Sequence, residues 1–204
     1  MANRQHWETV YQTKSADEVS WYRPHLEVSL ALIGKAAPAR DAAIIDVGGG
    51  ESTLVDDLLA AGYRNLSVLD ISQAALDVTQ ARLGPQAGQV TWMAGDITEV
   101  VLPAAQYDVW HDRAVFHFLT EPAQRAAYVA QVRRAVKPGG HVVIATFGPE
   151  GPQKCSGLDV MRYDATTLPA QFGAHFALQE STTERHETPW GSAQQFVYCL
   201  CRMA

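Results

Sequence analysis

Short apolar runs alternate with amphipathic stretches from Ala42 onward, and this alternation constrains the fold more than any other feature. Parallel strands joined by crossover helices produce such a pattern, because these strands are covered on both faces and their helices on one. The sequence therefore predicts an α/β protein with a doubly wound, mostly parallel, Rossmann-like sheet. Its strands are expected at 42–47, 66–70, 90–93, 107–111 and 141–147.

Helix signals lie between these strands. Ser52 and Ser72 each follow a predicted strand and can cap helices that run to about Ala61 and Leu83, where glycines stop them. Pro122 suits the first turn of a third helix that runs to Val136. The stretch 137–140, Lys-Pro-Gly-Gly, is then predicted to turn the chain into the fifth strand.

The two ends of the chain differ from this repeating middle. The runs 176–181 and 195–201 alternate as strands do and flank a turn-rich stretch, which predicts an antiparallel hairpin at the sheet edge. The stretch 1–38 is predicted to be a helical cover over the carboxyl ends of the strands, with one helix beginning near His25. We expect a single domain over 1–204, with this cover and a Rossmann-like core over 39–204. The cover contains the aromatic residues Trp7, Tyr11, Trp21 and Tyr22.

The composition narrows the range of partners. A chain of 204 residues with 47% hydrophobic side chains can bury one core. Its net charge of -6 argues against nucleic acid as a partner, because neutralising phosphates requires a surplus of Lys and Arg. No apolar run approaches the ~20 residues that cross a bilayer, and the first residues do not resemble a signal peptide. We expect a cytoplasmic protein without a membrane partner.

The cysteines Cys155, Cys199 and Cys201 are odd in number and have no CxxC spacing. Disulfides are not expected, and neither is a metal. The alternative is that these thiols, together with a histidine such as His186, bind a soft metal or a metalloid. The sequence leaves that alternative open.

The strongest chemical signal is Asp46-Val-Gly-Gly-Gly-Glu-Ser52, at the end of the first predicted strand. Glycines allow the backbone to approach a ligand closely, and an acid about 20 residues later can accept hydrogen bonds from ribose hydroxyls. Asp70 stands at that position, and Asp96 follows the third strand. Taken singly, Asp70 and Asp96 would be turn or helix caps. Because the carboxyl ends of the strands meet at one crevice, the three acids together predict a nucleoside-binding site.

With these residues in place, the stretch 44–147 resembles the class I S-adenosylmethionine-dependent methyltransferases. The resemblance implies the seven-stranded fold of that family and S-adenosylmethionine as the cofactor. The loop Asp46–Gly50 would hold the methionine part of the cofactor through Gly48, Gly49 and Gly50. Asp70 would bind the ribose and Asp96 the adenine amino group, with Ile71 and Ile97 on either side of the adenine ring.

One position departs from the family pattern, because Ser52 replaces the usual third glycine. A nicotinamide dinucleotide is the alternative cofactor. It is disfavoured because its fingerprint requires that glycine for close helix packing, and because Asp96 adds a further acid after the third strand. Aromatic faces attract a sulfonium cation, so Trp21 is also predicted to contact the cofactor.

The residues after the fourth strand are candidates for the methyl acceptor side. His117 has the chemistry of a general base near neutral pH, and Arg113 can hold a carboxylate or pair with Asp112. These three residues are predicted to be catalytic. The alternative is a local salt bridge between Asp112 and Arg113 and a packed His117. Methyl transfer requires a base only where the nucleophile carries a proton that must leave.

The predicted function is methyl transfer to a small-molecule acceptor with an O, N or S nucleophile, by a monomer or homodimer. A protein-lysine methyltransferase is the first alternative, because the stretch 6–11 and the turn that contains Asp112 are similar to members that modify translation factors. A non-catalytic module that binds S-adenosylmethionine is the second alternative. The same scaffold hosts many acceptors, so the fold does not identify the substrate.

Overall fold

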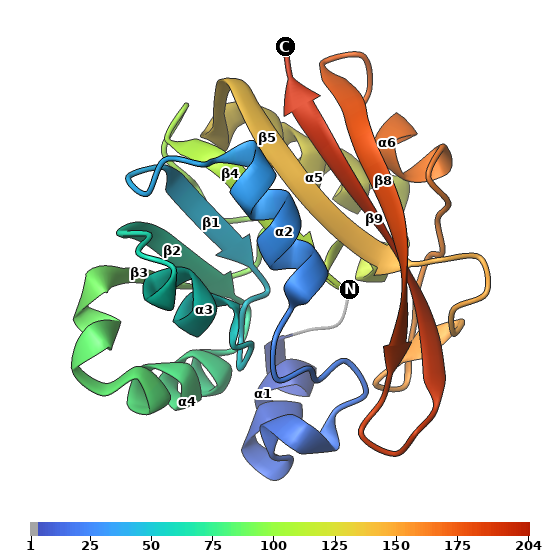
Figure 1. The fold of residues 1–204 in the computed structure, drawn as a ribbon. Coiled ribbons are helices and arrows are strands. Elements are labelled where there is room, and N and C mark those ends of the chain that lie inside the picture. Colours follow the sequence, from blue (N-terminus) through green and yellow to red (C-terminus); the bar gives the residue numbers. More distant parts are fainter. Residues whose placement is uncertain (1–3) are drawn as a thin grey trace.

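A seven-stranded sheet forms the centre of the protein, in a computed structural model that describes residues 4–204 (Figure 1). Its strand order is β3-β2-β1-β4-β5-β9-β8. The first five strands pair in parallel, while β9 pairs antiparallel with both β5 and β8. This confirms the predicted mostly parallel sheet with an antiparallel C-terminal hairpin. The strands are β1 Ala43–Val47, β2 Asn65–Asp70, β3 Val90–Ala94, β4 Tyr107–Arg113, β5 Val136–Phe147, β8 Phe176–Glu187 and β9 Ala193–Met203.

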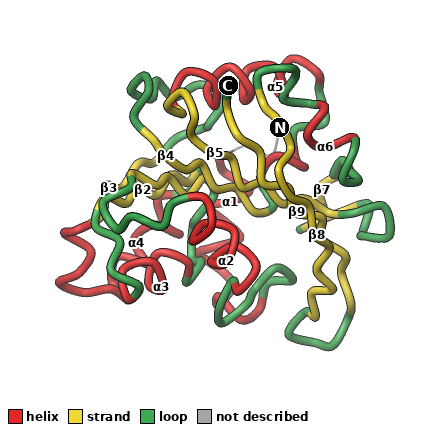
Figure 2. Tube along the Cα trace, turned by 45° about the horizontal axis from the view of Figure 1, so that its top comes forward, coloured by secondary structure: helices red, strands yellow, loops and turns green. Residues whose placement is uncertain are grey.

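Helices cover both faces of this sheet, as Figure 2 shows for α2, α3 and α4 on one side and α5 and α6 on the other. A separate two-stranded sheet pairs β6 Lys154–Cys155 with β7 Leu158–Asp159. The α-helices are α1 Arg4–Thr13, α2 Glu27–Ala36, α3 Leu54–Ala60, α4 Gln73–Leu83, α5 Pro122–Ala135 and α6 Thr167–Ala170. Three short 3-10 helices lie at η1 Ala16–Glu18, η2 Gly84–Gln89 and η3 Phe116–Phe118.

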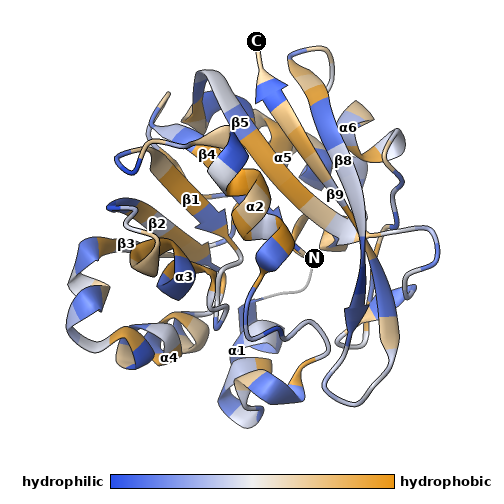
Figure 3. Cartoon of the chain, viewed as in Figure 1, coloured by the Kyte–Doolittle hydropathy of each residue, from blue (hydrophilic) through white to orange (hydrophobic). Residues whose placement is uncertain are grey.

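The hydrophobic core has two layers, one on each face of the sheet. Neighbouring residues of a strand face opposite sides, so Ile44 packs in one layer and Ile45 in the other. All five residues of β1 are buried. The central strands are accordingly the most apolar part of the sheet, as Figure 3 shows.

Strand β5 begins earlier than the sequence predicts. It starts at Val136 instead of His141, so the Lys-Pro-Gly-Gly stretch lies within the strand and does not form a separate turn. Val136 pairs with Tyr107, and the register then shifts so that His141 pairs with Val109. Gly139 takes a φ of +78° in this irregular segment. Pairing with β4 therefore outweighs the local turn preference of proline and glycine.

The predicted caps are confirmed at one helix and displaced at another. Ser72 caps α4, and its Oγ accepts a hydrogen bond from the Ala75 amide at 3.2 Å. Helix α3 begins at Leu54 with Thr53 as its N-cap, one residue later than predicted. The Ser52 Oγ still accepts a hydrogen bond from the Leu54 amide, at 3.1 Å. Pro122 lies in the first turn of α5, as predicted.

The N-terminal segment packs against the core at two places. Helix α1 contacts α4, and α2 contacts α3, β4 and β5. The helix predicted near His25 begins at Glu27. The division into a cover over 1–38 and a core over 39–204 stays a prediction, and residues 1–3 of that cover lie outside the described residues. Within residues 4–204, no helix has the length and apolar character needed to cross a membrane.

We predict that Tyr128→Phe lowers the free energy of unfolding by about 2 kcal/mol. The buried Tyr128 hydroxyl donates to Asp112 and accepts from Trp110 Nε1 at 2.9 Å, so the substitution leaves two buried polar groups without this partner. Denaturant unfolding measures the change. Tyr163→Phe is the matched control, because the buried Tyr163 hydroxyl makes no hydrogen bond within the described residues. Equal losses in the two variants would contradict this account.

Candidate cofactor and acceptor site

The turn after β1 leaves no room for a side chain at two of its glycines. Gly48 has a φ of +72°, and a Cβ atom there would lie 2.0 Å from Val115 Cγ2. Gly50 has a φ of +39°, and its Cβ would lie 2.9 Å from Asp70 Oδ2 and 3.2 Å from the Tyr11 hydroxyl. Only glycine fits these two positions without displacing neighbours. Gly48 lines the cavity beside this turn, so a ligand there meets backbone without a side chain.

Asp70 ends β2 beside this turn and is 4% exposed. Its Oδ1 accepts a hydrogen bond from the Ser72 amide at 2.8 Å. The pKa of Asp70 is raised to about 7, mainly by burial and in part by the nearby Asp46, although backbone hydrogen bonds from Ser72 and Gly50 oppose the shift. Keeping this carboxylate buried at the predicted ribose site therefore costs folding stability.

Asp96 follows β3, and its Oδ1 accepts hydrogen bonds from the Thr98 amide at 2.9 Å and the Thr98 hydroxyl at 2.7 Å. It therefore caps a local turn, which is the role that the sequence suggests for Asp96 taken singly. It also lines the same cavity as Asp70. The two interpretations are compatible, because a turn cap holds the carboxyl group in a fixed orientation.

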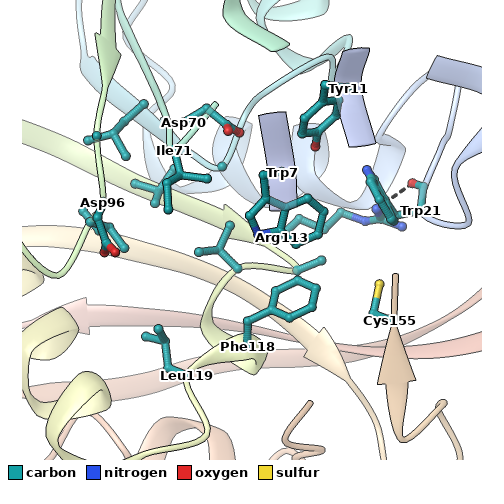
Figure 4. Close-up of a pocket in the computed structure, with 17 residues that line it drawn as sticks. Trp7, Tyr11, Trp21, Asp70, Ile71, Asp96, Arg113, Phe118, Leu119 and Cys155 are labelled. Atoms are coloured by element: carbon teal, nitrogen blue, oxygen red, sulfur yellow. Dashed lines mark hydrogen bonds between the residues drawn. The ribbon is translucent and has the colours of Figure 1, made fainter. Parts of the chain in front are cut away.

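Figure 4 shows this first cavity, which lies at the carboxyl ends of the parallel strands. It brings together residues predicted from five separate stretches of the sequence. The predicted residues that line it are Trp21, Gly48, Asp70, Ile71, Asp96, Ile97 and Arg113. Trp7, Tyr11, Phe118 and Cys155 complete the wall opposite the acids.

A second cavity adjoins the first, and Tyr11, Trp21, Gly48 and Arg113 line both. The predicted residues Asp46 and Gly49 line the second cavity only. Gly50 lines neither cavity, and its carbonyl accepts a hydrogen bond from the Thr79 hydroxyl at 2.7 Å. The glycine turn thus separates two adjoining spaces.

Asp46 is held by a buried chain of hydrogen bonds that sequence reasoning missed. His111 Nδ1 lies 2.7 Å from Asp46 Oδ1, and His111 Nε2 lies 2.9 Å from the Ser29 hydroxyl. All three residues are at most 5% exposed. A histidine within an otherwise apolar strand was the available sequence signal for this chain. It does not identify Asp46 as the partner of His111, because that contact depends on the pairing of β1 with β4.

Aromatic rings from the N-terminal segment line one side of the cavity. Trp7 makes edge-to-face contacts with Phe118 at 5.1 Å and with Trp21 at 5.7 Å between ring centroids. The Glu8 carboxylate fastens α1 to the start of α4 by accepting hydrogen bonds from the Gln73 amide at 2.8 Å and the Ala74 amide at 3.1 Å. Sequence reasoning missed Glu8, because no local pattern marks a carboxylate that caps a distant helix.

Asp112 and His117, predicted as catalytic, do not line either cavity. Both are fully buried. Asp112 accepts hydrogen bonds from Tyr128 and from the Val115 and Phe116 amides, which fixes the turn after β4. Burial lowers the pKa of His117 to about 3, so this imidazole is neutral near pH 7. Their burial outside both cavities favours structural roles over the predicted catalytic ones, and the alternative, a salt bridge between Asp112 and Arg113, does not form within residues 4–204.

Arg113 is the predicted acceptor-side residue that does reach the cavities. Its Nε donates to the Tyr198 hydroxyl at 2.8 Å, and its Nη1 donates to the Trp21 carbonyl at 3.0 Å. The guanidinium also lies over the Phe196 ring at 4.2 Å. Arg113 therefore joins the end of β4 to the segment that carries Trp21.

The three cysteines do not come together. Cys199 and Cys201 pack in one core layer and Cys155 in the other, so the sheet separates them. Burial raises the pKa of Cys155 to about 12, which keeps this cavity-lining thiol protonated. Among residues 4–204, no group of three or more His, Cys, Asp or Glu side chains is placed to hold a metal ion.

The fold and this site define a Rossmann-like protein that binds a nucleoside-containing ligand. Residues 44–140 match the family model described as a methyltransferase domain. The chain is 33% identical over 112 residues to malonyl-acyl-carrier-protein O-methyltransferase of Halalkalibacterium halodurans, covering 53% of this chain and 40% of that protein. It is 23% identical over 141 residues to mouse eEF1A lysine and N-terminal methyltransferase, covering 66% of this chain and 20% of that protein.

A solved structure shares the fold over most of the chain. It is 1,6-didemethyltoxoflavin-N1-methyltransferase of Burkholderia thailandensis, with bound 1,6-didemethyltoxoflavin and S-adenosylhomocysteine. The TM-score is 0.70 at 19% identity, over 98% of this chain and 87% of that one. Together with the strand order and the glycine and acid residues, these matches support a class I S-adenosylmethionine-dependent methyltransferase domain over residues 44–140. S-adenosylmethionine is the cofactor of that family.

We predict that Asp70→Asn stabilises the unliganded protein at pH 8 and weakens cofactor binding. Because the folded-state pKa is raised, the unfolded chain loses this proton near pH 4 and the folded protein only near pH 7. Stability is therefore lost as pH rises between these values. Removing the buried charge should raise the free energy of unfolding at pH 8 by on the order of 2 kcal/mol.

Denaturant unfolding at pH 5 and pH 8, with calorimetric titration of S-adenosylhomocysteine, measures both effects. Asp77→Asn, at an exposed position of α4, is the control and should change neither quantity. If Asp70→Asn keeps the wild-type affinity, Asp70 does not bind the cofactor.

We predict that Glu8→Ala loosens α1 and weakens cofactor binding by about tenfold. The substitution removes the carboxylate that the Gln73 and Ala74 amides contact, while the core stays intact. Hydrogen exchange of α1 should rise selectively. Gln12→Ala changes an exposed residue of the same helix and is the control. Unchanged exchange in Glu8→Ala would mean that aromatic packing alone holds the cover.

Proposed function

We propose that the protein transfers a methyl group from S-adenosylmethionine to a small-molecule acceptor with an oxygen, nitrogen or sulfur nucleophile. The observation that carries this proposal is the cavity lined by Asp70 and Asp96 on one side and by the aromatic residues of the cover on the other. A concave site with a largely apolar lining and a few polar groups is typical of small-molecule binding. The chain spans less than half the length of the two relatives matched by sequence, so their substrates are not transferred to it.

The residues present fit the cofactor. The glycine turn offers the close approach that a bound ligand requires, because a Cβ at Gly48 or Gly50 would collide with Val115 or Asp70. In our proposal Asp70 accepts hydrogen bonds from the ribose hydroxyls, Asp96 accepts one from the adenine amino group, and Ile71 and Ile97 contact the adenine ring. When bound, the cofactor supplies a methyl group activated by its sulfonium.

On the acceptor side, we propose that the protein acts mainly by positioning and by excluding water. Trp7, Trp21 and Phe118 form an apolar wall, and Arg113 supplies a fixed positive charge at its edge. His117 and Asp112 lie outside the cavity and take no part in this proposal. An acceptor whose nucleophile carries no proton that must leave needs no base from the protein.

A protein-lysine acceptor is the second candidate. Two observations favour it, namely the similarity to the mouse eEF1A lysine and N-terminal methyltransferase and the net charge of -6, which suits a basic target. A module that binds the cofactor without turnover is the third candidate.

Incubation of the protein with methyl-labelled S-adenosylmethionine and a cell extract separates these candidates. We expect label in the small-molecule fraction, and little in protein bands. The Asp70→Asn variant should lose the signal, while Asp77→Asn should retain it. Label in a protein band supports the lysine candidate, whereas cofactor binding without any transfer supports the non-catalytic candidate and contradicts our proposal.

A further inference from the structure

The first cavity has one side that carries acids and another that carries aromatic rings. Figure 4 shows Asp70 and Asp96 on the first side, which the proposed function assigns to the nucleoside. The other side, which we call the acceptor side, contains Trp7, Trp21 and Phe118. Within the part of the chain that the structure describes, no other Asp or Glu and no His lines this cavity. The acceptor side is therefore largely apolar and has no carboxylate or imidazole that can act as a base.

Two side chains with a hydroxyl or thiol group, Tyr11 and Cys155, also line this cavity. Burial raises the pKa of the Tyr11 hydroxyl well above its usual range. Burial also raises the pKa of the Cys155 thiol to about 12. Both groups therefore keep their protons near neutral pH, and the acceptor side offers no group that removes a proton from an incoming nucleophile.

Arg113 brings a positive charge to this cavity, and Figure 4 shows its side chain extending toward Trp21. The Arg113 side chain is 5% exposed, and its Nη2 makes no hydrogen bond within residues 4–204. Glu184 Oε2 lies 3.8 Å from that nitrogen, which is too long for a hydrogen bond, and Glu184 lines neither cavity. A buried donor without a partner costs stability, and a ligand atom that accepts from it removes that cost.

A buried cation at the acceptor side selects acceptors by their charge. An amine becomes positive when it gains a methyl group, and that charge would be repelled by Arg113. An anion is attracted, and it accepts the hydrogen bond that Arg113 Nη2 leaves unmade. The cavity therefore favours an acceptor whose nucleophile is already an anion when it enters.

The rings of the acceptor side favour an acceptor that is itself aromatic. Another ring can make the edge-to-face contacts that Trp7 already makes with Trp21 and Phe118. An aromatic ring also delocalises the negative charge of an attached sulfur or oxygen atom. It therefore lowers the pKa of that group, so that more of the acceptor is in the nucleophilic anionic form near neutral pH.

We propose that the acceptor is an aromatic molecule whose nucleophile is an ionised thiol or an ionised acidic phenol, held by Arg113 against the rings of the acceptor side. This inference rests on the proposed function and names its substrate class. A lone pair of the anion forms the bond to the methyl carbon, and the bond from that carbon to the sulfonium sulfur breaks with its electron pair left on sulfur. One negative and one positive charge cancel, and no proton is released. The step therefore needs no base, which agrees with the lining of the acceptor side.

Turnover of matched acceptors tests the substrate class. The protein is incubated with S-adenosylmethionine and with benzenethiol, para-nitrophenol or aniline, and the methylated products are measured by mass spectrometry. After correction for the uncatalysed rates, we expect kcat/KM for benzenethiol or para-nitrophenol to exceed that for aniline by about 100-fold or more. Transfer to the thiol alone identifies a thiolate as the source of the anion, and transfer to the phenol alone identifies a phenolate.

Binding without turnover tests the role of Arg113. In the presence of S-adenosylhomocysteine, calorimetric titration compares the Kd of benzenethiolate with that of its neutral product, methyl phenyl sulfide. We expect the wild type to prefer the thiolate by about tenfold to hundredfold, as a charge-assisted hydrogen bond implies. Arg113→Met should lose this preference and still bind the sulfide, and Arg113→Gln, which keeps a donor without the charge, is the milder second variant. Arg64→Met changes an exposed arginine outside the cavity and should keep the preference.

The affinity for S-adenosylhomocysteine reports whether each variant retains a folded cofactor site. Equal corrected rates for aniline and the two anionic acceptors, or no transfer to any of the three, would overturn the inference. An unchanged preference for the thiolate in both Arg113 variants would overturn it as well. The proposed function itself fails if the wild type does not bind S-adenosylhomocysteine.

Discussion

The pairing of β1 with β2 on one side and β4 on the other is the constraint on which the site depends. Every residue of β1 is buried, so the strand cannot shift without exposing core. The glycine turn follows the carboxyl end of β1, and Asp70 and Arg113 lie at the carboxyl ends of the neighbouring strands β2 and β4. The convergence of functional residues is therefore a consequence of parallel pairing and burial, and not of any attraction between those residues.

The site also holds charge that the fold alone would disfavour. Asp70 is buried with a pKa of about 7, and Asp46 and Glu51 lie close to the same turn. Burying such carboxylates costs stability, and the hydrogen bonds from Ser72, and from His111 to Asp46, offset part of that cost. A ligand that donates hydrogen bonds and carries positive charge would remove more of it. This is the expected relation between stability and function at a preformed binding site.

The N-terminal segment completes a cavity that the Rossmann-like core leaves open. Three separate contacts hold it in place, since Glu8 caps α4, Arg113 binds the Trp21 carbonyl, and His186 binds the Ser20 carbonyl at 2.6 Å. Two of these contacts come from β4 and the C-terminal hairpin. The hairpin therefore does more than extend the sheet, because Glu184 of β8 and Tyr198 of β9 also contact Arg113.

The sequence by itself determined the sheet, the hairpin, the glycine turn and the acids Asp70 and Asp96, because these follow from periodicity and from the chemistry that strand ends require. It also predicted aromatic residues over the site. It misplaced the start of β5, since sheet pairing outweighs local turn preference. Only the tertiary structure decided that Asp112 and His117 are buried away from the cavities. It also decided that Ser29, His111 and Asp46 form one chain of hydrogen bonds. It further decided that Arg23 and Arg113 line the same cavity. Such contacts join residues far apart in the chain, and their distances depend on packing that local sequence does not record.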